Sequence, residues 1–141
     1  MDKIILLTGG KRVGKDTFYY LLTKYSESLD KYYLNNFKRY AFADELKRDL
    51  QPLSQKMFKR TIDWLDDKEK EIFRPIMIAY GCAWREIDPL HWVKLVDYHI
   101  SLDKTPQYTS PLIPIITDCR FPNEIEFFKN KYKDAIVVEI E

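Results

Sequence analysis

The sequence predicts an α/β protein in which a short, mostly parallel sheet of about four strands lies between layers of helices. Short apolar runs typical of buried strands alternate along the chain with longer segments whose apolar residues recur at helical spacing. The first apolar run leads through a glycine-rich loop into a helix, and polar residues directly follow later apolar runs. In a parallel sheet these polar residues would gather beyond the carboxyl ends of the strands, where ligands bind.

The amino-terminal segment is predicted to form a strand, a tight loop and a helix, in that order. Residues 4–8 are an apolar run of β-type residues, and helical spacing resumes after the loop. Gly9, Gly10 and Gly14 would let the backbone turn tightly and bring its amides close to phosphate oxygens. A helix that starts near Lys15 would direct its unpaired amides and the positive end of its dipole at the same anion. The segment is therefore predicted to bind phosphates, with Lys15 reaching the β- and γ-phosphates.

The loop matches the phosphate-binding motif G-x-x-x-x-G-K-[ST] except at its last position. Asp16 stands where the metal-binding hydroxyl is expected, and Thr17 comes one place later. The alternative is an ordinary glycine-rich turn with solvated basic residues, but three of the chain's four glycines lie here, which favours a functional loop. The residues predicted to bind the donor are Gly10, Lys11, Arg12, Val13, Gly14, Lys15, Asp16 and Thr17.

The middle of the chain is predicted to be mainly helical. Asp44 stands where it would cap the helix that follows a second strand, and Pro52 limits that helix. Pro75 is expected in the first turn of a later helix and Gly81 at its end. The expected elements are a strand over residues 40–43, helices over 45–50, 63–73, 75–81 and 89–102, and an exposed loop over 104–111.

The carboxyl-terminal third is predicted to supply two further strands. Residues 113–117 form a continuous apolar run, as expected of a central parallel strand, with Pro114 near its start. A polar turn over residues 118–124 leads into a helix over 123–132, and residues 135–140 form the last strand. This alternation predicts helices on both faces of the sheet and right-handed connections.

Length and composition bound the classes of function. The 141 residues suit a single domain over 1–141, and the net charge of +1 gives no electrostatic indication of nucleic-acid binding. The first apolar run is too short for a signal sequence or a membrane span. Cys82 and Cys119 lie far apart without zinc-site spacing, which is typical of a reduced, cytoplasmic protein.

Two charged residues directly after the strand at 113–117 are the leading candidates for chemistry. Asp118 could hold Mg²⁺ beside the glycine loop, or it could cap a turn or helix. Arg120 would face a phosphate, or it would pair with Glu124 or Glu126. Asp16 could serve the metal in place of the missing hydroxyl, or it could simply begin the helix.

Other candidates lie in the predicted helices. Asp44 and Lys47 are three residues apart, so they could share a helix face and bind an acceptor, or act as a cap and a solvated lysine. Arg74 and Arg85 flank the helix predicted over 75–81, and a guanidinium binds two phosphate oxygens at once. Alternatively, each arginine pairs with a neighbouring acid such as Glu71 or Glu86.

The remaining aromatic and histidine residues are ambiguous. Trp84 and Trp92 could stack on a base, although burial in the core is the more common role of tryptophan. His91 and His99 have no triad partner in view, and both are predicted to be structural.

These motifs together resemble the viral and phage deoxynucleoside monophosphate kinases of the P-loop kinase superfamily. The resemblance covers almost the whole chain. A second resemblance, to animal-type phosphomevalonate kinase, uses Lys47, Arg74 and several of the same residues, but Trp92 and the Phe121-Pro122-Asn123-Glu124 segment favour the nucleotide kinases. The shared stretches are Gly9-x4-Gly14-Lys15-Asp16-Thr17, Phe42-Ala43-Asp44-Glu45-Leu46-Lys47, Gly81-x3-Arg85 with Asp88, Pro89 and Trp92, and Thr117-Asp118-Cys119-Arg120-Phe121-Pro122-Asn123-Glu124.

The resemblance implies a P-loop NTPase-type three-layer sandwich and transfer of the ATP γ-phosphoryl group to a deoxynucleoside monophosphate, with Mg²⁺ as cofactor. It implies a cytoplasmic enzyme of deoxynucleotide metabolism, in the host cytoplasm if the chain is viral. The catalytic residues would be Lys15, Asp118 and Arg120. The implied metal residues are Asp16, Thr17 and Asp118, and the implied acceptor residues are Asp44, Lys47, Arg74, Arg85, Trp92 and Arg120.

One departure from this family concerns the carboxyl terminus. In the relatives the chain usually continues beyond the strand that matches residues 135–140 and supplies a lid with arginines. The sequence here stops at Glu141, so the fold is expected to be truncated at this end. Three interpretations stay open: a minimal kinase, a kinase completed by a second copy or a partner protein, and a degenerate P-loop module with a structural or regulatory role.

Overall fold

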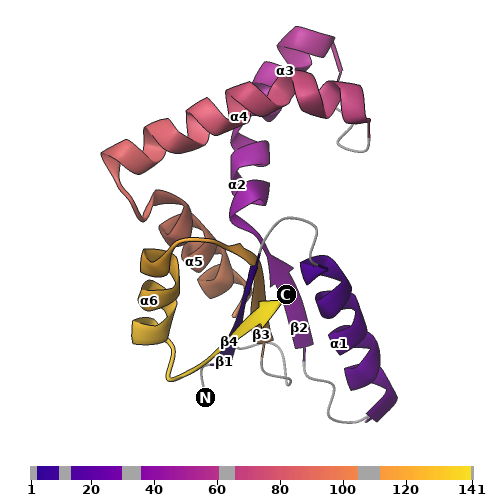
Figure 1. Cartoon of the computed structure of the whole chain (residues 1–141), viewed down its shortest axis with the longest axis vertical. Coiled ribbons are helices and arrows are strands. Elements are labelled where there is room, and N and C mark those ends of the chain that lie inside the picture. Colours follow the sequence, from indigo (N-terminus) through magenta and orange to yellow (C-terminus); the bar gives the residue numbers. More distant parts are fainter. Residues whose placement is uncertain (1–2, 10–13, 30–35, 61–65, 105–111, 141) are drawn as a thin grey trace. The chain divides into compact units, whose positions relative to one another are not determined.

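The computed structural model of the protein describes residues 3–9, 14–29, 36–60, 66–104 and 112–140 (Figure 1). The chain divides into two compact units. The first contains Met1–Phe42 and Val93–Glu141, and the second contains the segment between them, Ala43–Trp92.

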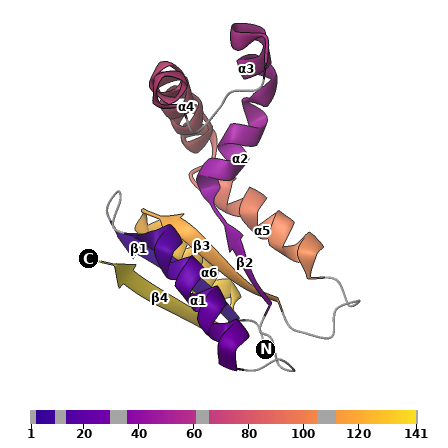
Figure 2. The ribbon, with the colours of Figure 1, turned by 90° about the vertical axis from the view of Figure 1, so that its right-hand side faces the viewer.

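The first unit contains a parallel sheet of four strands in the order β2-β3-β1-β4. Helix α1 covers one face of this sheet, and helices α5 and α6 lie on the other (Figures 1 and 2). The predicted α/β class and the parallel sheet flanked by helices are therefore confirmed. The elements of this unit are β1 (Lys3–Gly9), α1 (Lys15–Leu29), β2 (Asn36–Tyr40), α5 (His91–Asp103, here from Val93), β3 (Leu112–Cys119), α6 (Pro122–Lys131) and β4 (Asp134–Ile140).

The two central strands, β1 and β3, form the core of the sheet. Their side chains are apolar on both faces because helices cover both faces, which is why the sequence reads as continuous apolar runs. Ile5 lies opposite Ile115 and Leu6 opposite Ile116 in the parallel pairing. The buried apolar residues of these strands are Ile4, Leu6, Leu7, Ile113, Pro114, Ile115, Ile116 and Cys119, and Thr117 is buried with them.

The second strand begins and ends earlier than the sequence predicted. A strand was expected over residues 40–43, but β2 covers Asn36–Tyr40, and Phe42 already begins helix α2. The prediction was wrong for two reasons. Strand β2 is an edge strand with polar residues, so it lacks a continuous apolar run. The apolar run at 40–43 instead covers the end of β2 and the first turn of α2. Asp44 is accordingly in the first turn of α2 rather than at its cap.

The second unit is helical. Its elements are α2 (Phe42–Asp49, here from Ala43), α3 (Gln51–Phe58) and α4 (Asp67–Ile87). Asp66 caps α4, because its carboxylate accepts hydrogen bonds from the amides of Lys68 and Glu69 at 2.9 and 3.4 Å. Helix α3 was not predicted, although Pro52 in its first turn does mark the break after α2.

Helix α4 corrects the prediction of two helices over 63–73 and 75–81. Residues 63–65 lie outside the described part, and from Asp67 onward one helix continues through both Pro75 and Gly81. Proline removes one amide donor, and the carbonyl left without it belongs to Glu71, on an exposed turn where water can serve. Gly81 does not end the helix; a Cβ there would lie 2.8 Å from Cδ1 of Leu46, so glycine permits the close approach of α2.

Other boundaries are close to the expected ones. Helix α1 extends to Leu29, and α5 begins two residues after Pro89. The predicted loop at 104–111 lies outside the described residues from position 105 onward. None of the described helices is both long enough and apolar enough to cross a membrane.

Asp103 ties the end of α5 to strand β2. Its carboxylate accepts hydrogen bonds from Nζ of Lys38 at 2.7 Å and from the hydroxyl of Tyr40 at 2.6 Å. Burial raises the pKa of Asp103, but the hydrogen bonds from Lys38 and Tyr40 outweigh this effect and hold that pKa below its usual value. Burial and the bond to Asp103 raise the pKa of Tyr40, so its hydroxyl stays protonated. The folded state therefore favours a charged Asp103.

We expect Asp103→Asn to reduce the acid sensitivity of the fold. A depressed carboxyl pKa stabilises the folded state above the unfolded pKa, about 3.9, and this contribution is lost as the pH falls through the folded pKa. The variant should be less stable at pH 7 by about 1 kcal/mol and should lose less stability between pH 6 and pH 3. Urea unfolding at both pH values checks this, with Asp134→Asn as control because Asp134 makes only an exposed 3.9 Å pair with Lys3. Identical pH dependence in Asp103→Asn and the native protein would contradict it.

Candidate functional site

Strands β1 and β3 lie side by side, but the connections that follow them lead to opposite faces of the sheet. The chain leaves β1 through α1 and reaches β2, beyond β3; it leaves β3 through α6 and reaches β4, beyond β1. Adjacent parallel strands whose connections diverge in this way form a topological switch point, the usual position of ligand sites in α/β sheets. The carboxyl ends of β1 and β3, where Thr8 lies opposite Cys119, are therefore the candidate site.

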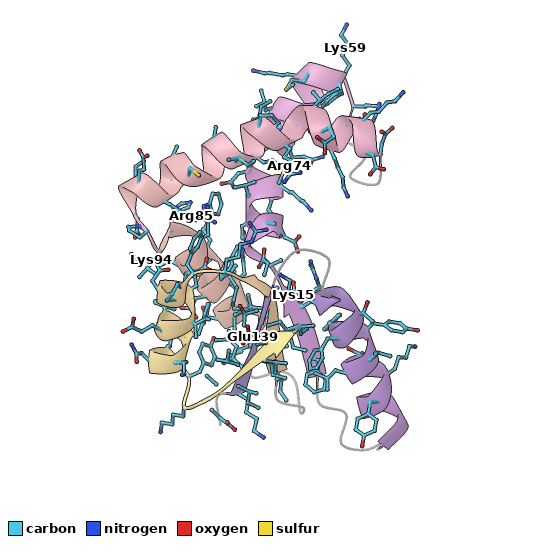
Figure 3. All side chains as sticks on the ribbon, viewed as in Figure 1. Lys15, Lys59, Arg74, Arg85, Lys94 and Glu139 are labelled. Carbon is cyan, nitrogen blue, oxygen red and sulfur yellow. The ribbon has the colours of Figure 1, made fainter. Side chains whose placement is uncertain are left out.

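The glycine loop begins and ends with backbone that favours glycine. Gly9 has φ +147° and Gly14 has φ +93°, in a region that residues with a Cβ rarely adopt. The Nζ of Lys15 donates a hydrogen bond of 3.3 Å to the carbonyl of Gly9, so the lysine folds back toward the start of the loop (Figure 3). Four of the predicted donor residues lie outside the described part of the chain: Gly10, Lys11, Arg12 and Val13.

The start of α1 places backbone amides at the end of β1, and the first three of them donate to no acceptor among the described residues. The amide of Phe18 donates to the carbonyl of Gly14 at 2.9 Å, which closes the first turn. The preceding amides of Lys15, Asp16 and Thr17 are the ones that a helix leaves without an intrahelical acceptor. Together with the helix dipole, such donors attract anions. The side chain of Thr17 is exposed, and only the backbone of Asp16 is described.

Asp118 is the penultimate residue of β3. Strand β3 pairs with β1, the strand that leads into α1. Its Oδ1 accepts a hydrogen bond of 2.8 Å from the backbone amide of Phe42, the first residue of α2. The capping role that the sequence left open for Asp118 is thus present, although the helix it serves is α2 and not the one that follows it. This hydrogen bond engages Oδ1 of the carboxylate.

We expect two substitutions of Asp118 to separate its structural role from a chemical one. Asp118→Ala removes the acceptor for Phe42 and should cost about 0.5–2 kcal/mol in the free energy of unfolding. Asp118→Asn keeps an acceptor oxygen, so its stability should stay within about 0.5 kcal/mol of native. If the carboxylate charge is needed for phosphoryl transfer, both variants should lose turnover at least about tenfold. Urea unfolding and an ADP-release assay on both variants check this; full activity in Asp118→Asn would restrict Asp118 to capping.

Glu124 fixes the backbone that carries Arg120. Its Oε1 accepts hydrogen bonds from the amides of Arg120 and Phe121, at 2.9 and 2.8 Å. Glu124 therefore caps the start of α6, and among the described residues the predicted pairing of its side chain with that of Arg120 is not formed. Glu124 therefore positions the turn between β3 and α6, a role that its spacing from Phe121 indicates.

The side chain of Arg120 is exposed and forms no hydrogen bond or ion pair with any of the described residues. It lines an open cavity of about 460 Å³ along α6. The other lining residues are Pro122, Ile125, Glu126, Lys129 and Asn130. Arg120 is thus available to an anionic ligand.

Cys119 lies between Asp118 and Arg120 but has no chemical role in this arrangement. The residue is fully buried. Burial raises the pKa of its thiol, and the negative charges of Glu124 and Asp118 raise that pKa further. A protonated, inaccessible thiol is not a nucleophile.

The remaining predicted acceptor residues belong to the second unit. Asp44 and Lys47 are half-buried on α2. Arg74 is exposed on α4 with Nη1 3.9 Å from Glu71, so the alternative of a weak local ion pair is present. Arg85 is half-buried on the same helix, with Nη1 3.7 Å from the position that a Cβ of Gly81 would take (Figure 3). The acceptor role of these four residues stays a prediction.

Trp92 is part of the core of the second unit. It is only 2% exposed, and its Nε1 donates to the carbonyl of Gly81 at 3.2 Å. His91 stacks flat on Trp84, with ring centroids 4.1 Å apart and planes 7° apart, and meets Trp92 edge-on at 4.6 Å. The structural interpretation of His91 fits this packing, and Trp92 has little surface to offer a base.

A magnesium ion bound together with a nucleotide would need few ligands from the protein. Among the residues that the structure describes, no group of three His, Cys, Asp or Glu side chains is placed to bind a metal ion. Mg²⁺ bound with a nucleotide takes most of its ligands from phosphates and water and needs only one or two from the protein. Asp118 and the hydroxyl of Thr17 are of the right chemistry for this.

Comparisons with known proteins do not assign this chain to a family: no protein-family model matches it, and no curated protein does. The candidate site is defined instead by its own geometry. A helix start with a lysine lies at the end of one parallel strand; a carboxylate lies near the end of the neighbouring strand, and a guanidinium follows that strand.

Proposed function

We propose that this chain is an ATP-dependent phosphotransferase that transfers the γ-phosphoryl group of ATP to the phosphate of a deoxynucleoside monophosphate. The observation that carries the proposal is the switch point between β1 and β3. The first amides of α1 and Lys15 follow β1 there, Asp118 lies near the end of β3, and Arg120 follows β3. Phosphoryl transfer requires such a convergence of cations, amide donors and one metal-binding carboxylate.

The residues of the first unit would divide the work by charge. Lys15 and the first amides of α1 would bind the donor phosphates and neutralise charge as the leaving group departs. Asp118 and Thr17 would hold Mg²⁺, which shields the phosphates and withdraws charge from them. Arg120 would bind the acceptor phosphate, for which a planar fork of donors is suited. The nucleophile is a phosphate oxygen, so no general base is required, and positioning supplies most of the rate.

An alternative is nucleotide binding without transfer, in a regulatory or structural module. The specific observation that favours it is the hydrogen bond between Asp118 and the amide of Phe42, because a carboxylate that caps a helix has an adequate role without metal. The departure at Asp16 from the usual hydroxyl points the same way.

The experiment that tests the proposal measures binding and turnover separately. Thermal unfolding is followed with ATP–Mg²⁺, with each deoxynucleoside monophosphate, and with mevalonate 5-phosphate, since a ligand that binds only the native state raises the melting temperature. ADP release is then assayed for each stabilising pair. A shift with turnover establishes the kinase and its acceptor. A shift without turnover supports the alternative, and no shift with any nucleotide refutes both.

We expect Arg120→Ala to weaken the acceptor much more than the donor. Removing one bidentate cation should raise the KM for the monophosphate about 10–100-fold while changing the KM for ATP less than threefold. Lys129→Ala is a matched control, because Lys129 is an exposed cation on the wall of the same cavity. Initial rates at varied concentrations of each substrate check this. An effect confined to the KM for ATP would show that Arg120 binds the donor and not the acceptor.

A further inference from the structure

The two edges of the sheet differ in how they meet solvent. Edge strand β2 is short, with five residues, and it carries the basic residues Lys38 and Arg39, which discourage the addition of another strand. Edge strand β4 is longer, with seven residues, and its central residues are apolar. Within the described part of the chain β4 pairs with β1 alone. Every second residue of β4 therefore directs its amide and carbonyl to the open side.

The side chains of β4 also remain incompletely covered. Ile136 is 46% exposed and Val137 is 39% exposed, and successive residues of a strand point to opposite faces. Both faces of this edge thus present a β-branched apolar side chain beside unpaired backbone groups. Such an edge is suited to the addition of a further strand.

The charges at the two ends of β4 have opposite signs. Lys133 precedes the strand and Glu139 lies near its end, and both side chains are exposed. Figure 3 shows Glu139 on β4. The other acid, Asp134, is 3.9 Å from Nζ of Lys3 on β1, so its charge is partly compensated within the sheet. The open edge therefore runs from basic to acidic.

We propose that β4 pairs with β4 of a second copy of this chain, antiparallel about a two-fold axis at Ile136, which joins the two sheets into one. In that register Lys133 lies opposite Glu139 of the second copy, and the reverse pair forms on the other side of the axis. Glu139 belongs to β4, whereas Lys133 directly precedes its first residue, Asp134, so each ion pair would form where one strand begins. Ala135 meets Val137, and Ile136 meets itself, so apolar residues occupy the centre.

The charge pattern favours antiparallel over parallel pairing of two β4 strands. A two-fold interface must be self-complementary, and an antiparallel strand with a basic start and an acidic end meets that condition. A parallel arrangement of two β4 strands would instead place lysine beside lysine and glutamate beside glutamate, which is unfavourable.

The first test is a charge exchange at the ends of the strand. The mass of the native chain is measured by sedimentation equilibrium over a range of concentrations, and a dimer is expected. Glu139→Lys and Lys133→Glu should each raise the dimer dissociation constant about tenfold, because each creates two like-charge pairs. The double variant should return it to near the native value. Glu126→Lys, an equal change of charge on the exposed face of α6, is the control and should leave it unchanged.

The second test uses the two-fold axis itself. Opposed residues of antiparallel strands have Cα atoms about 4.5–5.5 Å apart, within the range that a disulfide spans. In a Cys82→Ser background, which removes the exposed native thiol, Ile136→Cys should form a disulfide-linked dimer on oxidation. Val138→Cys should not, since its cross-strand neighbour would be Asp134.

Defined outcomes overturn the proposal. The proposal is wrong if the native chain stays monomeric at every concentration and its Ile136→Cys form does not cross-link. The edge of β4 would then pair with another segment or another protein, or with none. A dimer that Glu139→Lys does not weaken, or that the double variant does not restore, would place the interface elsewhere or in another register. Neither result depends on nucleotide binding, so the test is independent of the proposed activity.

Discussion

Lys15→Ala is expected to lower the turnover of phosphoryl transfer by about 10²–10³-fold while leaving the fold intact. The ammonium of Lys15 is the one described cation at the start of α1, where free amides and the helix dipole already favour an anion. Charge that develops between the donor phosphates in the transition state would lose its nearest positive partner. The loss should appear mainly in kcat, because that interaction strengthens as the reaction proceeds.

The structural cost of the same change should be small. Lys15 makes one hydrogen bond of 3.3 Å to the carbonyl of Gly9, and such a bond contributes about 1 kcal/mol or less. Alanine is also a better helix former than lysine at the first position of α1. The melting temperature without ligand should therefore change by only a few degrees.

Lys24→Ala is the matched control for this experiment. Lys24 lies on the same helix, is exposed, and has Nζ 5.7 Å above the ring of Tyr20, far from the helix start. It loses the same charge but should retain native turnover and the native ATP-induced thermal shift. If Lys15→Ala turned over as fast as Lys24→Ala, the phosphate site proposed at the start of α1 would be excluded.

The sequence predicted those elements of the fold whose environment is uniform. Strands β1 and β3 are buried on both faces, so each appears as a continuous apolar run and was located within one or two residues. Strand β2 was misplaced because an edge strand with Lys38 and Arg39 lacks that pattern. Helix α4 was predicted as two helices because proline and glycine normally interrupt or end helices. In the structure Pro75 lies on an exposed turn, and Gly81 permits close packing against Leu46.

The candidate site shows the same contrast between local and distant information. The order of strand, glycine loop and helix is local, and it placed Lys15 at the start of α1 correctly. The bond from Asp118 to the amide of Phe42 joins positions 76 residues apart, so local sequence could not reveal it. The order of the strands is also a tertiary property, and only the pairing of β1 with β3 brings Asp118 and Arg120 to the strand beside the loop.

Trp92→Ala is expected to destabilise the protein by about 3–5 kcal/mol, the largest stability effect of any substitution considered for this chain. Trp92 is 2% exposed, it packs against the rings of Tyr80 and His91, and its Nε1 donates to the carbonyl of Gly81. Truncation would leave a cavity beside α4 and remove a buried donor. Trp92→Phe keeps most of the volume but loses the 3.2 Å hydrogen bond, so about 1–2 kcal/mol is expected.

The same pair of variants decides whether Trp92 acts through the core or at an acceptor. Urea unfolding gives the stability, and the KM for the monophosphate gives the binding contribution. If Trp92 acts through the core, Trp92→Phe should lower stability and leave the KM within about twofold of native. If Trp92 instead stacks on a base, the reverse is expected, since phenylalanine stacks less well than tryptophan and would raise the KM without a comparable loss of stability.

Trp84→Ala provides the comparison, because Trp84 is only half-buried and stacks on His91. This variant should lose less free energy of unfolding than Trp92→Ala. Equal costs for the two tryptophans would show that the hydrogen bond to Gly81 and the deeper burial of Trp92 contribute little.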